Sequence, residues 1–198
     1  MKRQRVIVTL ALITALFTLG GCGINNIPSL DEQVKANWAQ VENQYQRRSD
    51  LVPNLVATVK GFAEQERETL QAVVEARSKV NSMQVDQSII NDPEALQKFE
   101  AAQSQLTSAL SRLMVVVERY PELKSNQNFL TLQSQLEGTE NRIAVARRDF
   151  IQSVQAYNTE IRTFPGRIWH SILYSDMPIR ETYEATTTGA EQAPQVEF

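Results

Sequence analysis

The sequence predicts an all-α protein, built as an up-and-down antiparallel four-helix bundle. Glycine and proline are sparse, with 7 of each among 198 residues, and residues that favour helices are frequent. Apolar residues recur at spacings of three and four, which is the heptad pattern of helices that pack along one face. The sequence contains no strand-like alternation of polar and apolar residues. An alternative has three long helices, the first of them kinked at Pro53.

The first 21 residues predict a lipoprotein signal peptide. A basic start precedes an apolar run from Val6 to Leu19, which is short of the roughly 20 residues that a transmembrane helix needs. The run ends in Leu-Gly-Gly-Cys, and these four residues resemble a bacterial lipobox. Cleavage there leaves Cys22 at the start of the chain, carrying acyl chains such as palmitate that hold a protein on a membrane. An uncleaved anchor helix and a plain signal peptide with an incidental cysteine are the alternatives.

The first helix is expected to follow a lipidated tether of residues 22–28. Ser29 and Glu32 have the spacing of a capping box, which predicts that this helix begins at Ser29. A proline inside a helix costs about 3 kcal/mol, whereas a proline in the first turn costs little. Pro53 therefore predicts a break near residues 48–50, with a new helix after it.

Three further helices are expected along the rest of the chain. The second covers about 51–80 and is followed by a polar loop over 81–91. The third covers 93–120 and ends at a proline. The fourth, over 125–164, carries the longest heptad pattern and forms a rod of about 60 Å at 1.5 Å per residue. Such a long, one-sided helix has to be covered along its length by the others.

The predicted bundle spans residues 29–165, and residues 166–198 are expected to hold a short apolar segment and a mobile tail. The apolar segment runs from Ile168 to Tyr174. It either closes the end of the bundle or touches a membrane or a partner. The tail from Ser175 onward is rich in Thr, Glu and Pro, a composition that does not favour a packed core.

Several ordered strings resemble the LemA family of bacterial envelope proteins. They are Gln46-Arg47-Arg48-Ser49-Asp50-Leu51-Val52-Pro53-Asn54-Leu55-Val56, Tyr120-Pro121-Glu122-Leu123-Lys124, Gly138-Thr139-Glu140-Asn141-Arg142-Ile143-Ala144-Val145-Ala146-Arg147-Arg148-Asp149-Phe150 and Ile161-Arg162-Thr163-Phe164-Pro165. The resemblance covers about residues 29–165. It implies a helical bundle outside the cytoplasmic membrane with no established enzymatic activity, and some relatives are linked to the organisation of specialised membranes. Family members commonly keep an uncleaved membrane helix, and the lipobox departs from that pattern.

Polar residues on the heptad positions are the candidate site. A buried charge needs a partner because each unpaired ion costs several kcal/mol, so Arg48 is expected to pair with an acid such as Glu140. The candidate residues either fix the register of the helices, as polar groups do in coiled coils, or line a groove for a peptide or lipid headgroup. These candidates are Arg48, Asn54, Glu140, Asn141, Arg147 and Arg148.

The sequence shows no catalytic constellation, and we expect neither enzymatic activity nor a cofactor. Cys22 is the only cysteine and His170 the only histidine, so a thiol or histidine metal cluster is not expected. The acidic chain, with a net charge of −3, argues against nucleic acid as a partner. We expect a lipid-anchored, non-enzymatic scaffold or adaptor of the bacterial cell envelope, on the periplasmic face of the outer or inner membrane where the host has two. Protein partners and homo-oligomers are compatible with it. The alternative is a ligand-binding or accessory subunit of an envelope enzyme or transporter.

Overall fold

The computed structural model describes residues 23–83 and 87–183, and within these ranges it contains helices and no strand. The all-α class is therefore confirmed. The predicted signal peptide and Cys22 lie outside the described residues.

Two long helices and two shorter ones make up most of the molecule. Their bounds are α2 Asn26–Lys60, α3 Arg67–Asn81, α4 Pro93–Val117 and α6 Gln127–Arg162. Three short elements accompany them: a 3-10 helix η1 Gln87–Asn91, α5 Pro121–Lys124 and α7 Gly166–Leu173.

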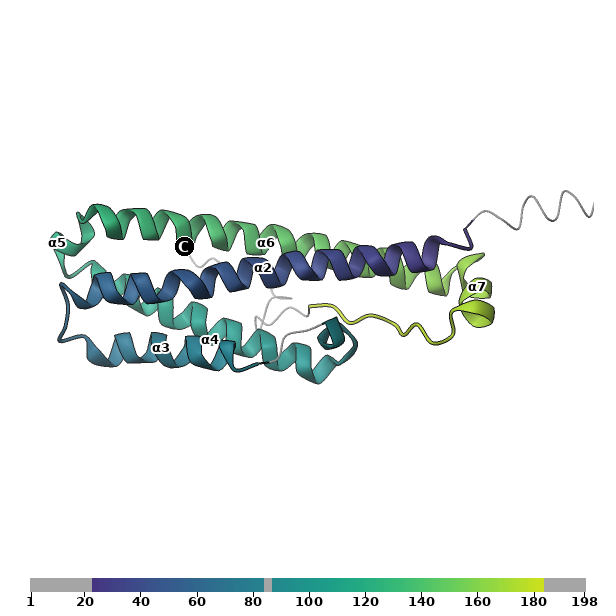
Figure 1. Cartoon of the computed structure of the whole chain (residues 1–198), viewed down its shortest axis with the longest axis horizontal. Helices are drawn as coiled ribbons and strands as arrows, with labels where there is room; N and C mark the ends of the chain where they lie inside the picture. The colour runs from purple at the N-terminus through teal and green to yellow at the C-terminus, as the bar shows by residue number, and fades with distance from the viewer. Residues whose placement is uncertain (1–22, 84–86, 184–198) are drawn as a thin grey trace, which may run out of the picture.

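The molecule is a rod with α2 and α6 side by side in opposite directions (Figure 1). Helices α3 and α4 pack against each other, and α3 also packs against α2. At one end of the rod α5 connects α4 to α6, and at the other end α7 lies beside the start of α2 (Figure 1). A helix of 36 residues such as α6 is about 54 Å long at 1.5 Å per residue.

The predicted break near residues 48–50 is wrong, because α2 continues through Pro53 to Lys60. A proline has no N–H, so it leaves the carbonyl four residues earlier without its helical partner. That carbonyl belongs to Ser49, and Arg77 of α3 donates to it from Nε at 2.9 Å. The neighbouring helix therefore supplies the hydrogen bond that Pro53 cannot make.

The true break falls at residues 61–66, between α2 and α3. Gly61 ends α2 and is exposed rather than packed against a neighbouring helix. The predicted capping box is also wrong, because α2 already begins at Asn26 and takes in both Ser29 and Glu32. The third and fourth helices start as the sequence suggests, and the side chains of Asp92 and Asn126 cap them.

A mobile tail was expected from Ser175 onward, but residues 175–183 pack along the rod, and residues 184–198 lie outside the described residues. After α7 the chain turns back along the rod beside α2 and η1 (Figure 1). Arg180 is 7% exposed, and its backbone N–H and carbonyl bond the side chain of Asn158 at 3.0 and 2.9 Å. The hydroxyl of Tyr157 donates to the Pro178 carbonyl at 3.0 Å. Paired backbone groups and a buried arginine outweigh the polar composition that suggested mobility.

Candidate functional site

Two apolar clusters follow each other along the rod, and a polar layer separates them. One cluster contains Trp38 and Phe150, and the other contains Leu55 and Leu106. Between them α2, α4 and α6 contribute buried polar side chains: Arg48, Ser49, Gln103 and Thr139. We call this set, together with Thr107 and Glu140, the polar layer.

Arg48 is the centre of the polar layer and is 1% exposed. Its Nη1 lies 2.8 Å from the Thr107 hydroxyl and 3.0 Å from Glu140 Oε1. Its Nη2 donates to the side-chain and backbone oxygens of Gln103. The arginine on α2 thus joins α4 to α6, and the pairing with Glu140 expected from the sequence is present.

The surroundings of Arg48 are unequal on its two sides. The Glu140 side chain is 40% exposed, so water shares its charge and weakens the ion pair. On the other side the guanidinium lies 5.0 Å from the centre of the Tyr45 ring, a cation–π contact. Burial raises the pKa of Tyr45, although Arg147 and Arg48 act in the opposite direction. The tyrosine therefore stays neutral beside the cation at physiological pH.

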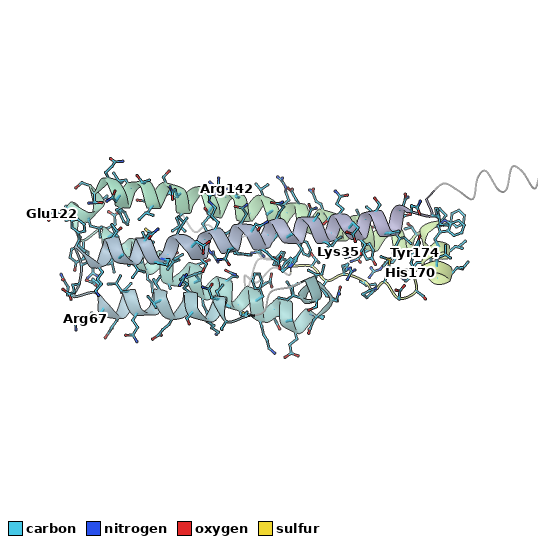
Figure 2. All side chains as sticks on the ribbon, viewed as in Figure 1. Lys35, Arg67, Glu122, Arg142, His170 and Tyr174 are labelled. Carbon is cyan, nitrogen blue, oxygen red and sulfur yellow. The ribbon has the colours of Figure 1, made fainter. Side chains whose placement is uncertain are left out.

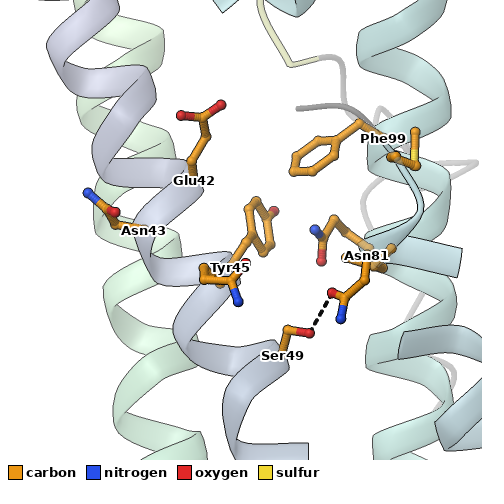
Figure 3. Close-up of a pocket in the computed structure, with 10 residues that line it drawn as sticks. Glu42, Asn43, Tyr45, Ser49, Asn81 and Phe99 are labelled. Carbon is orange, nitrogen blue, oxygen red and sulfur yellow. Dashed lines mark hydrogen bonds between the residues drawn. The ribbon is translucent and has the colours of Figure 1, made fainter. Parts of the chain in front are cut away.

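A pocket of about 340 Å³ opens beside the polar layer, between α2 and the end of α3 (Figure 3). Glu42, Tyr45 and Ser49 reach it from α2, and Asn81 faces them from α3. Ser49 donates to Asn81 Oδ1 at 2.8 Å across its floor (Figure 3). Its lining combines carboxylate, amide and aromatic groups, which suits a small polar ligand with an apolar part.

A second pocket of about 250 Å³ lies on the other side of the polar layer, between α4 and α6. Thr107 and Glu140 form its polar end, and Leu110, Met114 and Leu136 form its apolar side. Arg48 bonds two of the groups that line this pocket and one, Gln103, that lines the first. The two pockets therefore share one hydrogen-bonded centre.

Arg147 extends the charged region toward the C-terminal segment. Its Nη2 lies 3.4 Å from Glu100 of α4, and its guanidinium lies 4.0 Å from the centre of the Tyr183 ring. Tyr183 also packs on Trp38 and Phe150. Burial raises the pKa of Tyr183, so this ring too remains neutral at physiological pH.

The other candidates from the sequence do not join the polar layer. Asn54, Asn141 and Arg148 are exposed, and Arg148 pairs with its neighbour Asp149 at 2.9 Å. Side chains in water do not set the register of a packed core, so a register role is wrong for these three.

A second buried ion pair was missed from the sequence. Arg180 donates to Asp31 from Nε at 3.0 Å and also contacts it through Nη2. Asp31 is 1% exposed and lies four residues before Lys35, whose Nζ is 2.9 Å away. An acid on the apolar face of the first helix was the available signal, but nothing in the sequence marks Arg180 as its partner.

A family model described as the LemA family matches residues 37–198. The chain belongs to the LemA family. The match includes the C-terminal segment through Tyr183, which the sequence resemblance up to residue 165 leaves out. The packing of that segment on α2 and α6 gives this longer extent a structural basis.

Curated relatives of this LemA-family chain include two kinds of protein. Magnetosome protein MamQ 2 of Paramagnetospirillum magneticum is 27% identical over 157 residues, covering 71% of this chain and 58% of the relative. Protein LemA of Metamycoplasma hominis is 26% identical over 118 residues, covering 60% and 50%. The chain spans just over half the length of the curated relatives that it matches.

Three further observations concern metal ligands, the single histidine and membrane-spanning helices. Within residues 23–83 and 87–183 there is no group of three metal-ligating side chains. His170 bonds the Met177 carbonyl at 2.9 Å through Nε2. No helix in the same ranges is long and apolar enough to cross a membrane.

Proposed function

We propose that this LemA-family protein is a non-enzymatic scaffold or adaptor, lipid-anchored through Cys22 in the bacterial envelope. The observation that carries the proposal is the position of Gly23, the residue after Cys22, beside Pro165 at the end of the rod where α7 lies (Figure 1). An anchor at an end leaves the sides of the rod free, and α6 alone presents faces about 54 Å long. Partner proteins dock on these faces.

The contacts of the polar layer support a structural role for its charges. Arg48 is held by Gln103, Thr107 and Glu140, and these bonds fix α2, α4 and α6 at one register. A catalytic acid or base needs an oriented partner and access to a substrate atom. Arg48 is committed to its neighbours, and this supports a protein that works through its surfaces.

The relatives support a membrane-related location. Two of them, MamQ 2 and MamQ 1 of P. magneticum, are named magnetosome proteins. We propose that this chain also works at a membrane, in the organisation of membrane-bound proteins. The up-and-down four-helix arrangement belongs to the same proposal, with α2, α3, α4 and α6 as its helices.

Replacing the lipidated residue tests the anchoring. Cys22→Ser is expected to remove fatty-acid labelling and either release the protein from membranes or leave its signal peptide uncleaved. Asn25→Ser, a change three residues later, is the matched control and is expected to stay acylated and in the membrane fraction. Fatty-acid labelling that persists in Cys22→Ser refutes the lipoprotein proposal.

Crosslinking in intact cells tests the scaffold role. Photo-crosslinking residues placed on exposed faces of α3 and α6 are expected to capture defined envelope proteins, identified by mass spectrometry. Cys22→Ser provides the control, because a protein released from the membrane is expected to lose those partners. A crosslinking pattern without a defined partner at any position contradicts the scaffold proposal.

The pocket between α2 and α3 favours a second candidate function, a ligand-binding accessory subunit. Asn43 is exposed at its rim, so Asn43→Trp is expected to fill the pocket without disturbing the core. Loss of association with an envelope enzyme or transporter, at an unchanged melting temperature, would favour this second function. Unchanged association would favour the scaffold.

A further inference from the structure

Large apolar side chains gather at the end of the rod where α7 lies. Phe164 is 82% exposed, Ile168 44%, Ile172 67% and Leu173 50%. In the rest of the described chain, exposed large apolar residues are spread over α3, α4, α6, the loop after α2 and the C-terminal segment, as on most soluble surfaces. A cluster of four within ten residues marks a contact surface. We call these four residues the tip patch.

Other residues of α7, and the segment that follows it, are fixed on the bundle. Trp169 and Tyr174 pack against the apolar cluster that contains Trp38, and His170 bonds the Met177 carbonyl. Gly166 is buried where an added Cβ would meet the Glu160 carbonyl oxygen at 2.2 Å, so only glycine permits this approach. Because these contacts fix α7 on the bundle, the exposed apolar side chains of the tip patch cannot rotate into the core.

The N-terminal end of the described chain lies against the same end of the rod. A Cβ at Gly23 would lie 3.9 Å from Pro165 Cγ, and Asn26 donates to Glu160 at 3.3 Å. His170 and Tyr174 label this end in Figure 2, and Arg67 and Glu122 label the far one. The described chain therefore begins beside Pro165, at the end of the rod that carries the tip patch.

We propose that the tip patch is inserted into the lipid surface to which Cys22 is anchored. This inference rests on the proposed lipid anchor. Acyl chains on a residue adjacent to Gly23 hold this end of the rod at the bilayer, where Phe164, Ile168 and Ile172 meet lipid. Amphipathic segments lie in the interface of a bilayer, with their apolar side among the acyl chains and their basic residues at the headgroups. Arg167, exposed on α7, supplies the basic group.

The consequence is an orientation for the whole rod. A flexible tether alone would let the rod lie at any angle on the membrane. Contact through both the anchor and the tip patch makes the rod stand on its end, because the two contacts share one tip. Helix α3 and the α5 end are then carried away from the bilayer.

Lipid exposure of single labels tests the tip patch. The full-length lipoprotein is purified from membranes, where acylation blocks the Cys22 thiol, and carries a nitroxide at Ile172→Cys. Val115→Cys is the matched control, because Val115 is 70% exposed and lies near the far end on α4. Collisional accessibility to oxygen and to a water-soluble nickel chelate is measured before and after reconstitution into phosphatidylethanolamine–phosphatidylglycerol vesicles. The ratio of oxygen to nickel accessibility is expected to rise several-fold at position 172 and to stay constant at 115.

The outcomes separate the tip patch from the anchor. An unchanged ratio at position 172 in protein whose mass shows acylated Cys22 overturns the tip patch and leaves the anchor intact. Protein without acylation, with both labels in water, overturns both. A label at 172 that is already shielded without vesicles, or that couples to a second nitroxide, overturns the inference in favour of a protein occupant or a second copy.

Discussion

Replacing Arg48 with leucine should destabilise the bundle by about 2 kcal/mol. Glu140, with a 40% exposed side chain, can be solvated when its partner is lost. Thr107 keeps its bond to the Gln103 carbonyl at 3.1 Å. The cost therefore falls on the Gln103 side chain, which is left buried without its cation, and an unsatisfied buried polar group costs about 1–3 kcal/mol. For a chain of this size 2 kcal/mol lowers the melting temperature by about 4–8 °C.

The double variant Arg48→Leu with Gln103→Leu tests whether the loss of stability comes from the unpaired Gln103 side chain or from the changed packing at position 48. Removing both members of a buried polar pair is often nearly neutral, so it should recover most of the loss. Melting followed by circular dichroism and urea titration measures both variants. A single variant as stable as the parent, or a double variant no better than the single one, refutes this account. Intact partner binding in the single variant supports the register role, whereas lost binding with unchanged melting supports the groove.

Three further predictions follow from the contacts described above. Arg77→Leu should cost about 1–3 kcal/mol because it leaves a helix carbonyl unpaired; adding Pro53→Ala should recover much of this, since alanine restores the missing N–H, and a double-mutant cycle by urea unfolding checks the coupling. Above pH 10 the free energy of unfolding should fall by about 1.4 kcal/mol per pH unit for each buried tyrosine whose pKa burial raises, because the tyrosine ionises first in the unfolded chain. Tyr183→Phe should make this decline shallower than in the parent, with Tyr45 still contributing. An unchanged slope would contradict this prediction. Arg180→Leu leaves a buried carboxylate with one lysine partner and should cost about 3 kcal/mol; an unchanged melting temperature would show that the pair with Asp31 does not stabilise the fold.

Heptad spacing was enough to predict the class and most helices, because burial of one face dominates helix packing. The prediction failed at Pro53, because the expected break considered only the free-energy cost of a proline inside a helix. The compensating hydrogen bond comes from Arg77, 24 positions later, and no local pattern contains it. The true break at residues 61–66 contains no proline, and no side chain there caps the start of α3.

The candidate site was predicted in part for a similar reason. Arg48 stands out as a charge on an apolar face, and a charge there needs an acid, which leads to Glu140. Asn141 and Arg148 belong to the same string of sequence, but their side chains point to water. Resemblance marks a string as a whole, whereas burial is decided residue by residue.

The C-terminal segment was misjudged because its composition says nothing about its contacts. The sequence from Ser175 onward is rich in Thr, Glu and Pro, a composition that usually accompanies mobility. Here Arg180 finds a buried acid on the first helix, at a separation of 149 residues. Only the folded chain brings those two positions together.

This long separation sets an order on how the protein can be made. The apolar cluster that contains Leu55 and Leu106 needs no residue beyond Leu136 among its buried members, so it can form before the later part of the chain has emerged on the far side of the membrane. The cluster that contains Trp38 also needs Tyr183, which emerges later than Leu136. The half of the rod nearest the N-terminus is therefore the last to close, and a nascent chain keeps its first helix partly uncovered until then.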